Sequence, residues 1–379
     1  MISKLPAPLQ RFAVPIGVLV AAGLLLGVVP AILEPFRLNF FGQYLCFGIV
    51  AIGIGLAWGR GGMLTLGQGV FFGLGAYIMA MHMKLEDAKG TSLGIPDFMA
   101  LYGTDPQLPT WWKPFQSSIV TLVAIPVIPM ILAAGLGFMV FRRKVRGAYF
   151  AILSQALAGA FALWIVGNQT TTAGQNGMTN MRSFFGYDMN DPVNQRMVYS
   201  IIVVVMLALL LLTYQLMRSR FGELLVATRD AEERVRFLGY EPANVKLVAF
   251  VLSAGMAGIG GALYVPLSLL IAPSLIGIVP SIGFVIGVAI GGRNTWLGPV
   301  IGGTGIAWAQ QTLSEKYPAQ WQYLQGALFV VVIAVLPLGV ASLGPTLRAR
   351  FGKQPPSEDL EPSDAEITLP KATTAEVSA

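Results

Sequence analysis

Residues 197–217 read MVYSIIVVVMLALLLLTYQLM and contain no Asp, Glu, Lys, Arg or His. A helix of about 20 apolar residues is long enough to cross the roughly 30 Å hydrocarbon core of a bilayer. Nine further apolar runs without Asp, Glu, Lys or Arg lie at residues 12–33, 38–58, 63–83, 117–141, 147–166, 247–269, 278–292, 297–313 and 322–344. With 55% hydrophobic residues in 379, the sequence predicts an all-α polytopic membrane protein with about ten transmembrane helices.

The basic residues are distributed unevenly between the two sides that ten crossings define. With the N-terminus inside, eighteen of the 25 Lys and Arg fall in inside segments and seven in outside segments. The positive-inside rule therefore predicts that both termini are cytoplasmic. We expect a cytoplasmic N-terminus at 1–11, a transmembrane domain at 12–345 and a cytoplasmic tail at 346–379. The tail is rich in Pro, Ser and acidic residues, which predicts disorder.

Ionisable side chains are scarce inside the apolar runs. Besides Tyr and Cys46, the runs contain only His82, at the edge of one run. Membrane proteins that couple transport to protons or cations usually keep carboxylates or histidines in their spans. The sequence therefore favours passage of an uncharged or net-neutral solute, with the driving force supplied elsewhere. One His and one Cys provide few metal ligands, and no P-loop motif is present, so neither a metal, a cofactor nor an enzymatic activity is expected. A basic soluble face for nucleic acid is also missing.

One long inside segment, residues 218–246, is distinct from the membrane spans. Its apolar spacing predicts an amphipathic helix over 221–237, ended by Gly239 and followed by Pro242, before the chain re-enters the membrane at Lys246. This helix could be an ordinary interfacial helix or one that docks on a soluble motor subunit. With six basic and five acidic residues the segment is nearly neutral, which favours protein docking over anionic lipid.

Neutral polar side chains inside the spans are the candidates for contact with a solute. A buried amide or hydroxyl needs a hydrogen-bond partner, so each must face the bundle interior or a cavity. The alternative for each is an ordinary hydrogen bond between helices. The predicted solute-path residues are Thr65, Gln68, Ser154, Gln155, Ser253 and Ser281. Two long outside loops, 84–116 and 167–196, are either solvated connections or docking and gating elements.

Several motifs in one order resemble the permease subunits of branched-chain amino-acid type, LivM-like ABC importers. They read GMLTLGQGVFFGLGAY at 62–77, RGAYFAI at 146–152, GQNGMT at 174–179 and GGRNTWLGP at 291–299. The inside segment resembles the family motif that contacts the ATPase subunits. That resemblance implies a coupling role for Gly222, Ala227, Arg229, Asp230, Leu238 and Gly239.

The resemblance implies partners that this chain would need. These are two cytoplasmic subunits that bind ATP and Mg, a second homologous permease, and a periplasmic solute-binding protein. The site of assembly would be a bacterial inner membrane, and the mechanism would be alternating access.

Within the family, the chain is most similar to urea-uptake permeases. The residues that carry this finer resemblance lie at 68–72, 95–99, 108–112, 154–157 and 175–180, and Ala148 stands where many relatives have Asp. The resemblance implies transport of urea or short-chain amides. Branched-chain amino acids remain an alternative substrate, and an ATP-independent urea facilitator remains an alternative mechanism.

Overall fold

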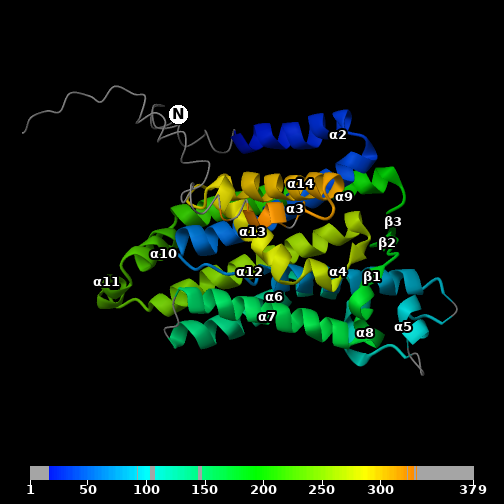
Figure 1. The fold of residues 1–379 in the computed structure, drawn as a ribbon, viewed down its shortest axis with the longest axis horizontal. Helices are drawn as coiled ribbons and strands as arrows, with labels where there is room; N and C mark the ends of the chain where they lie inside the picture. The colour runs from blue at the N-terminus through cyan, green and yellow to red at the C-terminus, as the bar shows by residue number, and fades with distance from the viewer. Residues whose placement is uncertain are drawn as a thin grey trace, which may run out of the picture. The chain divides into compact units, whose positions relative to one another are not determined.

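The computed structural model describes residues 17–91, 93–102, 107–143, 147–321, 323–327 and 330, which belong to one compact unit. Long helices run side by side through this unit (Figure 1). They are a first helix at Gly17–Ile32, which contains η2 (Leu24–Val28) and α2 (Val29–Ile32), then α3 (Pro35–Ile54) with its π-helical extension η3 (Gly55–Arg60), α4 (Gln68–Ala88), α6 (Ser118–Arg142), α7 (Ala148–Gly167), α9 (Pro192–Arg218), α12 (Pro242–Ser268), α13 (Ile278–Gly291) and α14 (Gly298–Lys316).

The predicted all-α membrane class agrees with this architecture. Among the described residues, nine of the ten predicted runs contain a helix, and the tenth, 322–344, lies largely outside them. Six helices are long and apolar enough to cross a membrane: those at Pro35–Arg60, Ser118–Arg142, Ala148–Gly167, Pro192–Arg218, Pro242–Ser268 and Pro273–Gly291. The count of ten therefore stays a prediction. The predicted termini 1–11 and 346–379, and Arg146 of the second motif, also lie outside the described residues.

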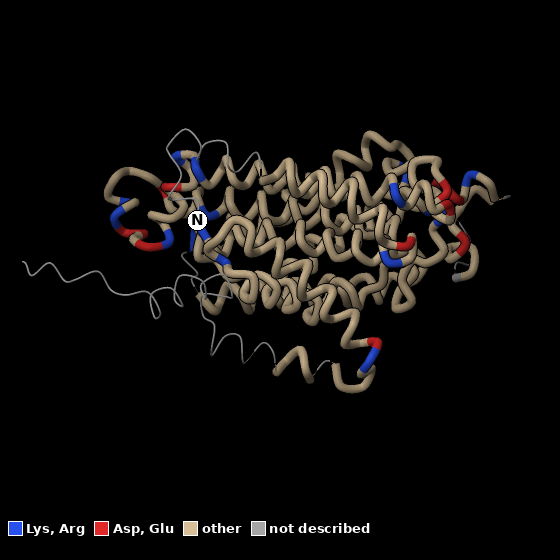
Figure 2. Tube along the Cα trace, turned by 90° about the horizontal axis from the view of Figure 1, so that it is seen from above, with Lys and Arg blue, Asp and Glu red and all other residues tan. Residues whose placement is uncertain are grey.

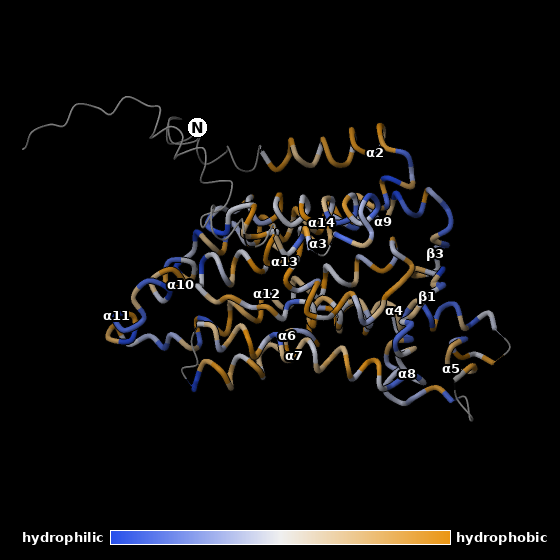
Figure 3. Tube along the Cα trace, viewed as in Figure 1, coloured by the Kyte–Doolittle hydropathy of each residue, from blue (hydrophilic) through white to orange (hydrophobic). Residues whose placement is uncertain are grey.

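Charged residues of the described chain gather at the two ends of the bundle and leave its middle free (Figure 2). The hydropathy colouring follows the same division, with apolar helices between polar ends (Figure 3). One end carries α10 (Arg220–Asp230) and α11 (Glu232–Phe237), and we call it the α10–α11 end. The other, the loop end, carries α5 (Asp97–Tyr102), η4 (Thr110–Gln116), α8 (Gln169–Thr172), η5 (Gly174–Asn176), β1 (Met178–Thr179), β2 (Ser183–Phe184), β3 (Tyr187–Asp188), β4 (Leu270–Ile271) and η6 (Pro273–Leu275).

The centre of the bundle is formed by α3, α4 and α12. In both Pro35–Arg60 and Pro242–Ser268, 72% of the most apolar window is buried, compared with 22% in α6 and 28% in α7. Glycines allow this close approach, because a Cβ at Gly75 would overlap the backbone of Gly258. Helices α6 and α7 therefore lie at the edge of the bundle, where most of their apolar side chains face outward.

The two long loops are attached to the bundle by specific contacts. Strand β1 pairs antiparallel with β4, and β2 pairs antiparallel with β3, with Met178 opposite Ile271 and Ser183 opposite Asp188. The Asp87 carboxylate on α4 accepts hydrogen bonds from the backbone N–H groups of residues 182 and 183, both at 2.9 Å. These contacts show more structure than a plain solvated connection has. A docking or gating role for the loops stays a prediction.

The inside segment differs from its predicted form in one respect. The prediction of a single helix over 221–237 was wrong, because the chain leaves helical conformation at Ala231 (φ −148°, ψ 65°) and forms two helices, α10 and α11. Gly239 does end α11 in the left-handed conformation (φ +84°). Its N–H donates to the carbonyl of Arg236 at 3.0 Å, as a glycine at this position commonly does. Helix α12 begins at Pro242 and includes Lys246, and the re-entry into the membrane at Lys246 stays a prediction.

Candidate functional site

The chain between η3 and α4 leaves helical conformation, and we call residues Gly61–Gly67 the first break. Backbone groups in a break lack the partners that a continuous helix supplies, and in an apolar interior they need others. Two serines from distant helices supply them. The N–H of Leu66 donates to Ser154 Oγ of α7 at 3.0 Å, and the N–H of Gly69 donates to Ser281 Oγ of α13 at 3.0 Å.

Each of these serines also donates a hydrogen bond of its own. Ser154 Oγ donates to the carbonyl of Ala151 at 2.8 Å, and Ser281 Oγ donates to the carbonyl of Gly277 at 3.0 Å. Both hydroxyls are therefore used as donor and acceptor, and both side chains are buried. Their first role is structural, since they satisfy the backbone at the start of α4.

Gln68 is the first residue of α4 and is fully buried. Its Nε2 donates to Ser253 Oγ of α12 at 2.8 Å. Its Oε1 is also buried but has no hydrogen-bond partner within the described residues. Thr65, in the first break, accepts from the N–H of Gly67 at 3.4 Å. We call the set Thr65, Gln68, Ser154, Ser253 and Ser281 the polar cluster.

The structure thus brings together five of the six predicted solute-path residues around the first break. The sixth, Gln155, follows Ser154 on α7 and points to a different side of that helix, where it is partly exposed. Every member of the polar cluster is a neutral amide or hydroxyl. The cluster can exchange hydrogen bonds with a neutral polar molecule, and the unpartnered Gln68 Oε1 can accept one from an N–H donor.

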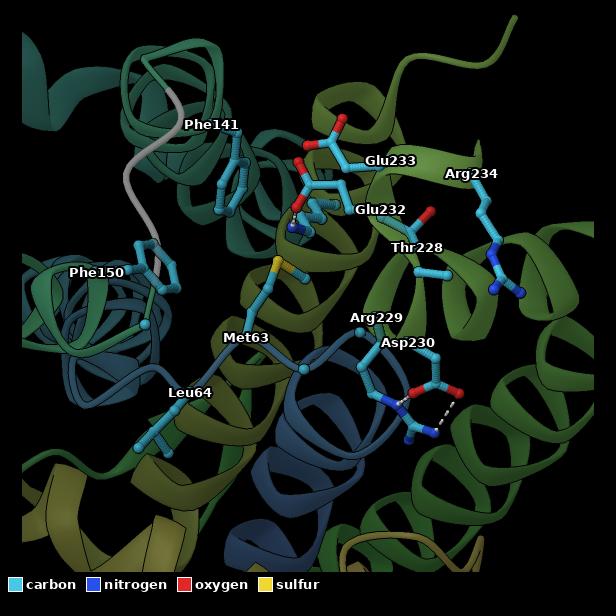
Figure 4. A pocket seen from close by; sticks show the side chains of 15 residues that line it. Met63, Leu64, Phe141, Phe150, Thr228, Arg229, Asp230, Glu232, Glu233 and Arg234 are labelled. Atoms are coloured by element: carbon cyan, nitrogen blue, oxygen red, sulfur yellow. Dashed lines mark hydrogen bonds and ion pairs between the residues drawn. The ribbon is translucent and has the colours of Figure 1, made fainter. Parts of the chain in front are cut away.

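A cavity of about 560 Å³ opens at the α10–α11 end, next to the first break. Its walls come from residues 61–64 of the break, from Phe141 and Phe150 at the facing ends of α6 and α7, and from Thr228–Arg234 (Figure 4). Charged side chains surround it, and Lys246 Nζ lies 2.8 Å from Glu232 Oε2. The cavity therefore reaches Leu64, the residue before Thr65, from the side of α10 and α11.

Arg229 connects α10 to the first break. Its Nη1 donates to the carbonyl oxygen of Gly59 at 2.7 Å. Its Nε donates to Asp230 Oδ1 at 2.7 Å (Figure 4). Gly62 lies under the same side chain with φ +70°, and a Cβ there would be 2.7 Å from Arg229 Cγ. The hydrogen bond from Arg229 holds the pKa of the Asp230 carboxyl below its usual range, so this ion pair is present at neutral pH.

Comparison with known protein families agrees with the predicted permease class. The family model for the branched-chain amino acid transport system permease component matches residues 36–335. The chain belongs to this permease family. It is an ABC importer permease of the branched-chain amino-acid type, and permeases of this kind are transport subunits, not enzymes.

Curated relatives cover most of the permease. The high-affinity branched-chain amino acid transport system permease protein LivM of Salmonella typhimurium is 24% identical over 335 residues, which span 80% of this chain and 70% of the relative. LivH of Escherichia coli is 22% identical over 311 residues, which span 78% of this chain and 90% of the relative. No solved structure matches the chain. As a multi-pass relative of importer permeases, the chain belongs with ATPase and binding-protein partners.

Two of the other predicted coupling residues, Gly222 and Leu238, differ in burial. Gly222 is buried where a Cβ would overlap the backbone of Met217, so its role is close packing of α10 on the end of α9. Leu238, in contrast, is 75% exposed. Two exposed neighbours were missed by the sequence reasoning, namely Phe237 (90% exposed) and Tyr240 (54% exposed). Their signal was the sequence FLGY around the helix cap, which places large apolar side chains on a turn.

Gly59 was also missed. Its contribution is a backbone carbonyl, and nothing in the residue type indicates that an arginine 170 residues away will bind it. The predicted coupling residues Ala227 and Asp230 lie on α10 beside Arg229. Ala227 accepts a hydrogen bond through its carbonyl from the N–H of Ala231 at 2.8 Å, which closes α10 at the break between the two short helices.

Proposed function

We propose that this permease carries urea, or a short amide of similar chemistry, from the periplasm to the cytoplasm. The observation that carries the proposal is the polar cluster, whose members are all neutral and whose Gln68 Oε1 lacks a donor among the described residues. A buried acceptor without a partner costs about 1–3 kcal/mol, which a bound N–H donor would recover. Urea offers such donors at both ends and has no net charge, so it needs no ionised side chain in the path.

The proposal assigns α10 and α11 to the contact with the ATPase subunits. Among the described residues, this end carries more Lys and Arg than the loop end, which supports a cytoplasmic location under the positive-inside rule. Phe237, Leu238 and Tyr240 expose apolar surface there, as a docking site does. ATP-driven closure of the ATPases would displace these short helices and rock the membrane helices between outward- and inward-open states.

Arg229 is the proposed link in this movement. Its hydrogen bond to Gly59 joins α10 to the last turn of η3, and the first break runs from there to Gln68. A displacement of α10 therefore acts on one end of the break, and the polar cluster lies at the other.

Uptake of labelled urea in cells that lack this chain tests the proposal. Wild type and the control Arg142→Ala, at the same end but on α6, should restore uptake. Arg229→Ala should insert and assemble with its partners but fail to restore uptake. Normal uptake by a well-expressed Arg229→Ala variant would contradict the coupling role. No urea deficit in the deletion cells would contradict the substrate.

A second substrate class is supported by the relatives. LivM and LivH, at 24% and 22% identity, are named as branched-chain amino acid permeases. Competition of labelled-urea uptake by leucine and by acetamide separates the two: inhibition by acetamide alone supports urea and amides, and inhibition by leucine supports branched-chain amino acids. Uptake that persists without the ATPase subunits would instead indicate an ATP-independent facilitator.

A further inference from the structure

A groove of about 700 Å³ runs between α13 and α14 toward the α10–α11 end. Its lining is apolar and includes Ile290, Leu297, Ile301 and Ile306. Gly305 also lines the groove, and a Cβ at this position would meet no atom within 4 Å, so the space beside it is open. Ile301 is 66% exposed, so the groove opens on the outer surface of the described part of the bundle. Its shape and chemistry fit a hydrocarbon chain.

Aromatic and basic side chains gather where this groove meets the α10–α11 end. Trp296 lines the groove, and its ring lies 5.3 Å from that of Tyr214 on α9. Arg218 lies over the Tyr214 ring, 5.5 Å from its centroid, and donates to the Tyr214 hydroxyl at 2.9 Å. Arg293 lies over the Trp58 ring at 5.0 Å. Both guanidinium groups are therefore held on aromatic faces.

Neither of these arginines forms an ion pair with an acidic side chain in the described part of the chain, whereas Arg229 and Arg236 at the same end do. Arg218 uses Nη1 for the Tyr214 hydroxyl, but the other N–H groups of Arg218 and those of Arg293 donate to no acceptor within the described residues. The planar fork of a guanidinium suits phosphate oxygens. Neither arginine lines the groove itself: Arg218 contacts Tyr214, which packs on Trp296 of the groove, and Arg293 borders a small neighbouring cavity with Trp58. An apolar groove with two such arginines beside its end is complementary to an anionic headgroup joined to an acyl chain.

We propose that this site binds an anionic glycerophospholipid. The phosphate lies at Arg218 and Arg293, Trp296 and Tyr214 flank the headgroup region, and one acyl chain occupies the groove past Ile301 and Gly305. Basic pockets between helices on the cytoplasmic side of membranes bind anionic headgroups in this way. A second permease copy or another protein segment over the groove is the rival occupant, but such a segment needs no basic cluster at one end. The proposal does not depend on which solute is carried.

Native mass spectrometry of the full permease, purified in detergent with its partner subunits, tests the site. Phosphatidylglycerol is titrated against phosphatidylcholine. Removal of one basic contact near a membrane surface weakens binding by about fivefold, so Arg218→Gln with Arg293→Gln should weaken retention of phosphatidylglycerol by about 25-fold. The matched control is Arg142→Gln, because Arg142 also lies over an aromatic ring (Phe138, 4.3 Å) but outside this groove. It should leave retention unchanged.

A second variant tests the groove without touching a charge. Gly305→Leu should fold normally, because its side chain enters open space, and should reduce retention of phosphatidylglycerol by about the same factor as the double arginine variant. Gly135→Leu on α6 also has open space around its Cβ and is the control. Equal retention by all variants, or no preference for phosphatidylglycerol over phosphatidylcholine, would overturn the proposal. Loss of the second permease subunit in Gly305→Leu with lipid retention intact would also overturn it, and would identify the groove as a subunit interface.

Discussion

Two helix pairs in this permease are interrupted by glycine-rich sequence, and the interruptions differ in what supports them. The end of the first break, Gly61–Gly67, and the first turn of α4 that follows it depend on hydroxyls from α7 and α13 that lie 88 and 212 residues away. The second break, between α13 and α14 at residues 292–297, is supported locally. Thr295 Oγ1 donates to the carbonyl of Gly292 and accepts from the N–H of Gly298, both at 3.0 Å. A locally supported turn can hold its shape alone, whereas the first break follows whatever moves its neighbours.

Removing the distant hydroxyls should have the largest effect. Ser154→Ala combined with Ser281→Ala leaves the partly buried N–H of Leu66 and the buried N–H of Gly69 without acceptors, and each costs about 1–3 kcal/mol. We expect the free energy of unfolding to fall by about 2–6 kcal/mol, measured by thermal unfolding in detergent. Thr295→Ala in the second break should lower it by about 1 kcal/mol or less, because Thr295 is exposed and water can replace its hydroxyl. Equal losses in both variants would remove the distinction between the two breaks.

The second prediction asks whether the first break also contacts solute. Gln68→Leu keeps about the same side-chain volume but removes both the unpartnered Oε1 and the Nε2 that donates to Ser253. Uptake should therefore fall by at least about tenfold, the equivalent of about 1.4 kcal/mol. Gln155→Leu is the matched variant, since Gln155 was predicted for the same role but is partly exposed. It should retain uptake within about twofold. Initial rates of labelled-urea uptake at equal protein levels provide the measurement, and the reverse order would place the path on the outer side of α7.

The sequence predicted the membrane class, nine apolar runs that contain the long described helices, and five buried polar residues that come together in the polar cluster. These follow from apolar length and from the cost of burying polar groups, both of which are local properties. It also predicted the cap at Gly239, because a positive φ demands glycine. It did not predict the break at Ala231, where an unremarkable alanine leaves helical conformation (φ −148°). The bond from Arg229 to Gly59 was likewise invisible, since it joins a side chain to a backbone carbonyl across the fold.

A third, smaller effect concerns the contact between the two breaks. Arg293 belongs to the second break, and its guanidinium lies over Trp58 near the start of the first. Arg293→Ala should lower the free energy of unfolding by about 0.5–1 kcal/mol, as a partly exposed cation–π contact does. Arg142→Ala, which removes a comparable contact with Phe138, should cause a similar loss. A loss as large as that of the double serine variant would show that the two breaks are one cooperative unit, not two.

The smallest effect should come from Asp230, which holds Arg229 from the solvent side. Asp230→Asn removes the ion pair but leaves the hydrogen bond from Arg229 to Gly59, so uptake should change by less than about twofold. The pKa of the Asp230 carboxyl is below its usual range, so the pair is present above that range and is lost only as the pH falls through the lowered value. Wild type and Asp230→Asn should therefore show the same dependence of uptake on cytoplasmic pH between about 6 and 8. A loss as complete as that expected for Arg229→Ala would mean that the first break receives its movement through the ion pair and not through the carbonyl of Gly59.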